Sequence, residues 1–505
     1  MLRIFNLTLF VLILISSSAF SANDEYQKKL IDGINHTFNF QFDKAEQIFN
    51  DLVKSNNSDA RAYVYMANIY VIQYLSDKRK SDFNRFEYFS DRAIQTAENA
   101  LKKNTNDKKA LYSLASINGY RTLVFLLAEK YIDGVWAAKQ CLDYTDDLLE
   151  LDQNYFDAYL WKGIFDFALS QIPSSAKYVL KIAGIEGNFS AGIKGLQKAS
   201  KEGIFTNTEA KYFQSQIYSA YLNDNKTAEE LLQVLVEQFP KNILFKYSLA
   251  SVKIKLRKIR EADELLNDVL LNANSKFKNV LDLTYFLKGD CAFYQNQFNQ
   301  AKPFYLQFIE NNSEDDFKPT ACYRLALSHE LTNQRENAKK YYQLALEKKG
   351  ETEDDLYSKR LAGEYLKNGV SSEEALVILA RNYFQNDKFD LMISSFENLL
   401  KNNSSSNYTQ LMNYYLGRAN LEMNKFDESY KCLSKIGNNK NLKESWLVPY
   451  SKYYLALINS KMNRKNESFM MLDIVENYSN YDFEKQLNTW VQALKERLND
   501  GSFSK

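Results

Sequence analysis

The stretch that decides the fold is YFLKGDCA at residues 285–292, followed by FNQAKPFYLQF at residues 298–308. The first part places an aromatic residue near Gly289, and the second sets Phe298, Ala301 and a further aromatic residue three and four positions apart. Intervals of three and four residues put side chains on one face of a helix. The stretch therefore predicts two amphipathic helices joined by a short turn, with small residues where their backbones come closest.

The same two-helix pattern recurs over most of the chain. The position equivalent to Ala301 falls at residues 228, 262, 301, 338, 392, 429 and 468. These positions are 34, 39, 37, 54, 37 and 39 residues apart, and the longest step leaves room for an extra helix around residues 354–366. A single helix pair cannot bury its apolar faces alone, so consecutive pairs are expected to stack into one continuous core.

The composition agrees with a helical chain. The 505 residues include only 16 Gly and 5 Pro, which disfavours an all-β chain, since such a chain needs turn residues every ~8–12 positions. The formal net charge is +1. Nucleic acids attract proteins through clustered positive charge, so we expect no nucleic-acid partner.

The spacing of the helix pairs resembles the tetratricopeptide repeat, and a more specific resemblance lies between about residues 155 and 270. It begins with GIF at residues 163–165, LSQIP at residues 169–173, a Gly-rich corner AGIEGN at residues 183–188 and GIKGL at residues 192–196. A helical pair follows, with EQFP at residues 237–240 and SLA at residues 248–250. This order is similar to the inclusion-body-clearance family of tetratricopeptide proteins. The resemblance implies an all-helical protein that is not an enzyme.

We therefore predict an all-α chain, a tetratricopeptide-type helix-turn-helix solenoid that winds as a right-handed superhelix. Divergent N-terminal helical repeats with inserts are expected over residues 22–204, and a regular repeat array over residues 205–480. Residues 481–505 are expected to form a capping helix and tail, because Leu487, Val491 and other apolar residues share one stripe there and cover the last open face of the array.

The N-terminus is typical of a signal peptide over residues 1–21. Arg3 gives a positive start, residues 4–15 are mostly apolar, and residues 16–21 include several small residues before a predicted cleavage after Ser21. The mature chain is then expected in the periplasm or secreted, without a transmembrane span. The alternative is an uncleaved N-terminal anchor, for which about a dozen apolar residues are short of the ~20 that span a bilayer.

The sequence offers no group of residues typical of catalysis. Its two histidines, His36 and His329, are far apart, whereas metal sites and nucleophile triads group imidazoles with carboxylates or thiols. The Gly-rich phosphate-binding motifs and the Gly-x-Ser-x-Gly motif are absent from the sequence. We predict no enzymatic activity, no cofactor and no metal site.

The candidate binding surface is the concave face of the solenoid, which the first helix of each repeat lines. At the fifth position of that helix, six of the seven clearest repeats carry an aromatic residue, and charged residues share the face. These candidate groove residues are Phe213, Tyr247, Phe286, Tyr323, Tyr414 and Tyr453, together with Asp290, Arg381 and Arg418. Aromatic side chains give a large contact area with a peptide, but the same position also serves packing, and the sequence leaves both roles open.

Our leading hypothesis is an exported scaffold that binds a protein or peptide through this concave face. No fifth-position residue is Lys, which disfavours the partners that other tetratricopeptide domains grip by a C-terminal carboxylate through Lys at that position. The alternative is a helical carrier or hydrolase with a pocket in the irregular region of residues 60–200.

Overall fold

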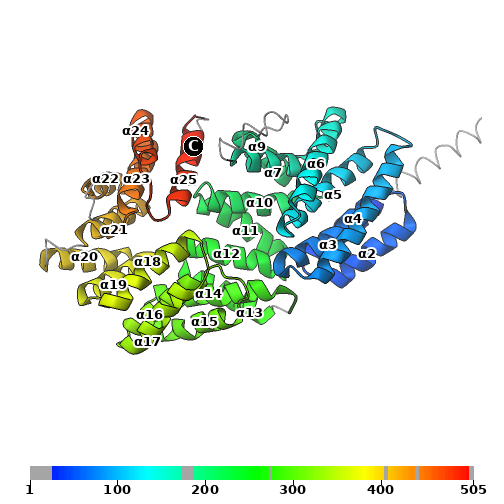
Figure 1. The fold of residues 1–505 in the computed structure, drawn as a ribbon. Helices are drawn as coiled ribbons and strands as arrows, with labels where there is room; N and C mark the ends of the chain where they lie inside the picture. Colours follow the sequence, from blue (N-terminus) through cyan, green and yellow to red (C-terminus); the bar gives the residue numbers. More distant parts are fainter. Residues whose placement is uncertain (1–24, 173–186, 273–274, 403–407, 438–442, 500–505) are drawn as a thin grey trace, which may run out of the picture. The chain divides into compact units, whose positions relative to one another are not determined.

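The computed structural model describes residues 25–172, 187–272, 275–402, 408–437 and 443–499 (Figure 1). Every regular element in these ranges is a helix, and none of the helices is long and apolar enough to cross a membrane. The predicted signal peptide and most of the Gly-rich corner at residues 183–188 lie outside the described residues. The predicted fold class, an all-α chain of tetratricopeptide-type helix pairs, is confirmed.

The chain forms two compact units, which we call unit 1 and unit 2. Unit 1 comprises residues up to 214 together with residues 231–245 and 274–278, and unit 2 comprises residues 215–230, 246–273 and the chain from residue 279 onward. The boundaries predicted at residues 204/205 and 480/481 concern the regularity of the repeats, and they stay predictions.

Unit 1 begins with a helix at residues 25–38. Its further helices are α2 (Phe42–Ser55), α3 (Arg61–Asp77), α4 (Lys80–Leu101), α5 (Lys108–Leu127), α6 (Tyr131–Leu151), η1 (Phe156–Ala158), α7 (Tyr159–Ser170), α9 (Phe189–Glu202) and η2 (Ser275–Phe277). Three helices are divided between the units, namely α10 (Asn207–Ala220), α11 (Asn225–Gln238) and α12 (Ile243–Lys255).

The glycines of the family-like motif let α7 and α9 approach closely. A Cβ atom on Gly163 would lie 2.7 Å from the backbone nitrogen of Leu196, and one on Gly192 would lie 2.6 Å from that of Phe167. Backbone atoms cannot move aside as a flexible side chain can. Gly163 and Gly192 of this motif are therefore explained by the packing of these two helices.

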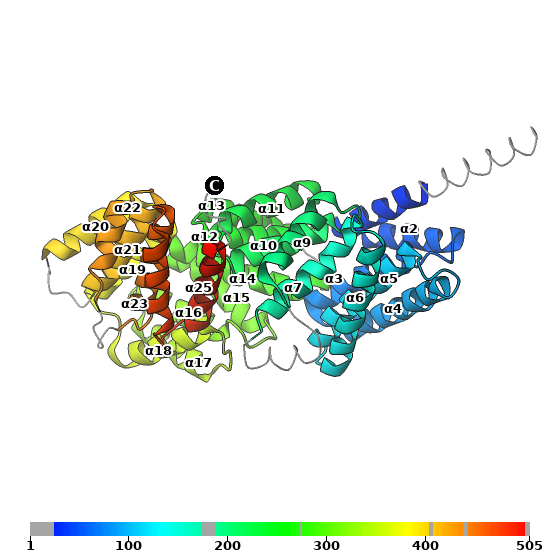
Figure 2. The same cartoon turned by 90° about the horizontal axis from the view of Figure 1, so that it is seen from above.

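Unit 2 contains the regular pairs (Figures 1 and 2). Its helices are α13 (Ile259–Asn272), α14 (Lys278–Tyr294), α15 (Phe298–Asn311), α16 (Lys318–Glu330), α17 (Arg335–Glu347), α18 (Glu353–Asn368), α19 (Ser372–Gln385), α20 (Phe389–Asn402), α21 (Thr409–Glu422), α22 (Phe426–Ser434), α23 (Leu447–Lys461), α24 (Lys465–Glu476) and α25 (Glu484–Asn499). Helix α18 is the extra helix that the long step predicted. Helix α25 buries Leu487, Val491 and Leu494 in the same core as Leu455 and Leu472, as expected of a capping helix.

The predicted small positions lie at the helix–helix contacts. All seven, from Ala228 to Ser468, are fully buried. Where serine replaces alanine, its hydroxyl donates to a carbonyl of the preceding helix, from Ser429 to Gly417 at 2.7 Å and from Ser468 to Ala456 at 2.8 Å. The hydroxyl is thereby satisfied. In the opening stretch, Gly289 lies against the ring of Tyr305, which comes within 2.5 Å of where a Cβ atom would stand.

The turn inside each pair has a left-handed residue five positions before the buried small position. Five of these residues are asparagine and one is Asp387, which tolerate this conformation well. The exception among the seven is Arg257, with φ of 66°. The full set is Asn223, Arg257, Asn296, Asn333, Asp387, Asn424 and Asn463. The left-handed conformation is strained for a residue with a long side chain, so the presence of Arg257 at this turn position requires an explanation.

Candidate functional site: an aromatic and arginine-lined cavity in unit 2

Unit 2 contains a cavity of about 550 Å³. Its walls come from the first helices of successive pairs, α12, α14, α16, α19, α21 and α23, together with the end of α10, the extra helix α18 and the capping helix α25. The second helices of the pairs contribute only Asn225, the first residue of α11, to the lining. The cavity is therefore lined mainly by the first helices of the repeats in unit 2.

Aromatic side chains are the largest group in the lining. They are Phe293, Tyr294, Tyr323, Tyr357, Tyr365, Phe384, Tyr414, Tyr415, Trp446, Tyr450, Tyr454, Phe483 and Trp490. Several form edge-to-face contacts that run from one helix to the next: Tyr414 to Trp446 at 5.1 Å, and Tyr450 to Trp490 at 5.9 Å between ring centroids. Such contacts hold the rings in defined positions, so the wall is a rigid aromatic surface.

Arg257 ties two distant repeats of unit 2 together across the cavity wall. Its Nη2 lies 2.6 Å from Oε2 of Glu422 on α21, and its guanidinium lies over the rings of Phe384 and Phe389. Glu422 also faces Arg418, at 3.6 Å. One carboxylate thus serves two guanidinium groups, and the strained conformation of Arg257 is explained by this bridge.

Arg418 and Arg324 are both held by neighbours. Arg418 lies 3.8 Å from the ring centroid of Tyr454 and donates to the hydroxyl of Tyr414 at 3.2 Å. Arg324 forms a buried ion pair with Asp290, whose carboxylate also accepts from the hydroxyl of Tyr305 at 2.7 Å. These contacts hold both guanidinium groups in position, so no ligand is needed to explain where they lie.

Arg381 differs from the other arginines of the wall. It lies over the ring of Tyr415, 5.3 Å from its centroid. Among the residues that the structure describes, it has neither an ion pair nor a hydrogen bond. Its donors are therefore available to a ligand in the cavity.

The predicted groove residues do not all reach this cavity. Tyr323, Tyr414, Arg381 and Arg418 line it. The others lie elsewhere: Asp290 is buried behind Arg324, Phe286 packs on Phe308 and Phe317, Tyr453 packs on Trp490, Tyr247 is half-buried beside Ala250, and Phe213 belongs to unit 1. Whether the four lining residues bind a ligand stays a prediction.

Sequence reasoning missed Lys255, Arg257, Arg324 and the aromatic residues of α18 and α25 as lining residues. One signal could have found Arg257, because it stands where the other regular repeats have Asn or Asp. The residues of α18 and α25 carry no such signal, since these helices lie outside the repeated pattern.

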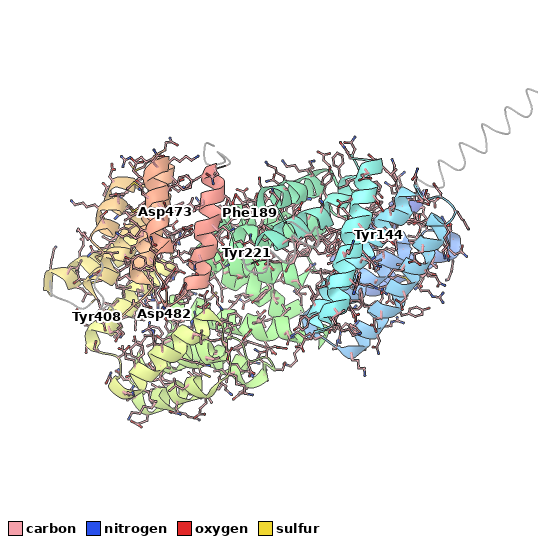
Figure 3. All side chains as sticks on the ribbon, turned by 45° about the horizontal axis from the view of Figure 1, so that its top comes forward. Tyr144, Phe189, Tyr221, Tyr408, Asp473 and Asp482 are labelled. Atoms are coloured by element: carbon pink, nitrogen blue, oxygen red, sulfur yellow. The ribbon has the colours of Figure 1, made fainter. Side chains whose placement is uncertain are left out.

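A second cavity in unit 2, of about 780 Å³, lies around the start of α25. Asp482, labelled in Figure 3, accepts from Arg360 at 3.0 Å. The carboxylate of Glu353 accepts from the backbone nitrogens of Lys485 and Gln486 at 2.8 and 3.0 Å. A negative charge is favourable there, because the N-terminus of a helix carries a partial positive charge. These contacts attach the capping helix, and they explain the charges without a ligand.

Unit 1 holds its converging polar groups inside the core. The hydroxyls of Tyr65 and Tyr112 are 2.6 Å apart, and Glu209 accepts from Tyr120 at 2.8 Å and from Asn68 at 3.0 Å. Burial raises the pKa of Glu209 to about 7, although both hydrogen bonds lower it. These groups satisfy one another away from solvent, which favours a structural role over the pocket considered for residues 60–200.

Acidic, histidine and cysteine side chains form no group of three or more that could hold a metal ion within the described residues. The three most buried thiols, Cys141, Cys291 and Cys322, are free. Burial raises the pKa of each of them, so none is activated as a thiolate.

Residues 159–356 match the model of the Iml2/Tetratricopeptide repeat protein 39 family. The predicted recognition is confirmed: the chain resembles the tetratricopeptide repeat proteins of this inclusion-body-clearance family. The match extends beyond the region around residues 155–270 that carries the sequence motifs. No protein of curated function matches the chain.

Solved structures of other proteins show a weaker likeness. A tetratricopeptide repeat protein from Parabacteroides merdae is 13% identical, with 57% of this chain and 99% of that chain covered and a TM-score of 0.24. The P58(IPK) TPR domain is also 13% identical, with 82% and 95% covered and a TM-score of 0.22. The human IFIT1 dimer with PPP-AAAA is 12% identical, with 76% and 95% covered and a TM-score of 0.36.

Proposed function

We propose that the chain is a protein-binding scaffold whose unit 2 receives an extended peptide segment of a partner in the aromatic and arginine-lined cavity. The observation that carries the proposal is the origin of the lining, which comes almost wholly from the first helices of successive repeats. Repeat arrays present extended concave surfaces of this kind to their partners.

The chemistry of the wall suits a peptide. Aromatic rings supply a large contact area, and the side-chain amides of Asn223, Gln385 and Gln486 lie among them. Amide groups can both donate to and accept from a peptide backbone. A volume of about 550 Å³ lies within the ~300–1,000 Å³ typical of ligand sites, so the cavity holds a short part of the partner and not a folded domain.

The test is to fill the cavity without removing any core side chain. Ala220 is exposed at the end of α10 and lines the cavity, so Ala220→Trp places an indole in the binding space. Leu271→Trp is the matched control, because Leu271 is 84% exposed on α13 and does not line the cavity. Phage displaying random peptides are selected on the full-length protein and then bound to each variant.

We expect Ala220→Trp to reduce the retained phage titre by about ten-fold or more, a loss of about 1.4 kcal/mol of binding free energy. Leu271→Trp should retain the wild-type titre. Equal retention by wild type and Ala220→Trp, with both proteins equally helical by circular dichroism, would refute binding in this cavity.

We also propose that the chain is exported, on the basis of the charged start, apolar stretch and small residues at positions 1–21. N-terminal sequencing of the protein from a secreting host should give a mature chain that begins at Ala22. A chain that retains Met1 and stays with the membrane fraction would support the uncleaved anchor instead.

A further inference from the structure

The wall of the unit 2 cavity carries an excess of positive charge. Five cations line it, and the lining includes one carboxylate, Asp354. The cations are Lys255, Arg257, Arg324, Arg381 and Arg418. Two further carboxylates lie directly behind the wall, Asp290 against Arg324 and Glu422 against Arg257 and Arg418. Among these groups the cations outnumber the carboxylates by two.

Other nearby carboxylates are already engaged. Glu444 accepts from the indole of Trp446 at 2.8 Å and from the hydroxyl of Tyr357 at 3.0 Å, and it faces Arg360 at 3.4 Å. Glu374 forms an ion pair with Lys443 at 2.5 Å. Neither carboxylate forms an ion pair with a cation of the cavity wall, although the charge of Glu444 acts on Arg381.

Of the five lining cations, Arg381 and Lys255 form no ion pair among the described residues, whereas Arg257, Arg324 and Arg418 each do. Arg381 contacts the face of Tyr415 and forms no ion pair or hydrogen bond among the described residues. Lys255 donates to the hydroxyl of Ser219 at 2.9 Å and is otherwise exposed to the cavity. A cation that the protein itself leaves unpaired inside a concave surface attracts an anionic group of a ligand.

The guanidinium of Arg381 suits a carboxylate in particular. A guanidinium packed on an aromatic ring keeps its in-plane N–H groups available, and two parallel N–H donors match the two oxygens of a carboxylate. Tyr323, Tyr357 and Tyr415 line the same cavity and offer ring surface to an apolar neighbour of that carboxylate.

We propose that this cavity selects its peptide by a carboxylate that pairs with Arg381, with an aromatic or aliphatic residue beside that carboxylate in the peptide. The proposal rests on the peptide-binding function above and specifies the class of peptide. The carboxylate can come from an Asp or Glu side chain or from the C-terminus of a partner.

The experiment compares Arg381→Gln with Arg260→Gln. Both substitutions remove one positive charge, and Arg260 is exposed on α13 away from the cavity. Phage displaying random peptides are selected separately on the full-length wild type and on each variant, and the retained peptides are sequenced. Phage-displayed peptides fused through their C-terminus present only side-chain carboxylates.

If the carboxylate comes from a side chain, the wild type and Arg260→Gln should enrich Asp or Glu next to an aromatic or aliphatic residue, and Arg381→Gln should lose this enrichment. Binding of a selected peptide, measured by fluorescence anisotropy, should weaken by about ten-fold or more in Arg381→Gln, as expected for the loss of a charge-assisted pair. Arg381→Lys should restore part of the affinity, because it keeps the charge but not the two parallel donors.

The source of the carboxylate is decided with the same peptides in synthetic form. A side-chain source predicts equal affinity for C-terminal acid and amide versions. A C-terminal source predicts that the free acids of random peptides bind and that amidation abolishes binding, with no acidic enrichment among the phage. Either result supports pairing with Arg381, provided that the Arg381→Gln substitution abolishes the binding that is measured.

Two outcomes contradict different parts of the account. Peptides that bind equally to wild type and Arg381→Gln, but not to Ala220→Trp, would refute the carboxylate pairing and leave the peptide-binding function standing. Peptides that bind equally to wild type and Ala220→Trp would refute the proposed function itself. Circular dichroism of each variant verifies that the helices are intact.

Discussion

Units 1 and 2 bring polar and aromatic side chains together in opposite ways. In unit 1, Tyr65, Tyr112 and Glu209 are buried and bond to one another or to neighbouring side chains. In unit 2, Tyr323 and Arg381 line a cavity of about 550 Å³, and Arg381 has no ion-pair partner in the described part of the chain. Related helix pairs thus enclose polar groups in the core of one unit and line a cavity with them in the other, so an internal polar cluster does not by itself identify a site.

The largest expected effect concerns the buried carboxyl of unit 1. Burial raises the pKa of Glu209 from 4.5 to about 7. The folded carboxyl therefore keeps its proton between these values while the unfolded one loses it, and the folded state binds more protons. Stability falls as the pH rises through this window and changes no further above about pH 7.

Glu209→Gln should abolish this dependence, because the amide cannot ionise but can still accept from Tyr120. The shift corresponds to about 3 kcal/mol of unfolding free energy between pH 4.5 and pH 8. Urea unfolding of both proteins at these two pH values measures the difference. If wild type and Glu209→Gln lose stability equally, the carboxyl of Glu209 is not enclosed as the structure has it.

A pair of glycines tests how tightly the unit 1 core is filled. A Cβ atom on Gly119 would lie 2.3 Å from the ring of Trp161, whereas one on Gly363 in α18 of unit 2 would lie 3.8 Å from its nearest neighbour, Leu346. Gly119→Ala should cost about 2 kcal/mol by overpacking. Gly363→Ala should stabilise by about 0.5–1 kcal/mol, because alanine favours the helix.

Thermal unfolding followed by circular dichroism measures the stability of both variants, and Gly363→Ala is the control for the effect of helix propensity. A gain in stability from Gly119→Ala would mean that Trp161 has room to move and that the core of unit 1 is looser than described.

The smallest effects separate a structural arginine of unit 2, Arg257, from Arg381, for which we propose a binding role. Arg257→Gln should cost about 1–2 kcal/mol, since it leaves the carboxylate of Glu422 without its shorter ion pair. Arg381→Gln should change stability by less than about 0.5 kcal/mol, as expected where no ion pair is lost. Urea unfolding midpoints measure the stability of both variants. A large loss of stability in Arg381→Gln would mean that Arg381 serves the fold and not ligand binding.

The repeat pattern could be predicted from the sequence because it depends on local spacing. The buried positions from Ala228 to Ser468 and the extra helix α18 follow from intervals along the chain. The site could not be predicted in the same way. Arg257 meets Glu422 only through the stacking of all the repeats between them, and fifth-position residues such as Phe286 and Tyr323 look alike in sequence although only Tyr323 reaches the cavity.

The most direct test of the central claim is hydrogen exchange of the full-length protein, followed by mass spectrometry, with and without a peptide selected on the wild type. Binding in the unit 2 cavity predicts slower exchange in α16, α19 and α21, which carry Tyr323, Arg381 and Tyr414. The outer helices α15, α17 and α20 should be unchanged. Slower exchange confined to those outer helices or to unit 1 would contradict the claim.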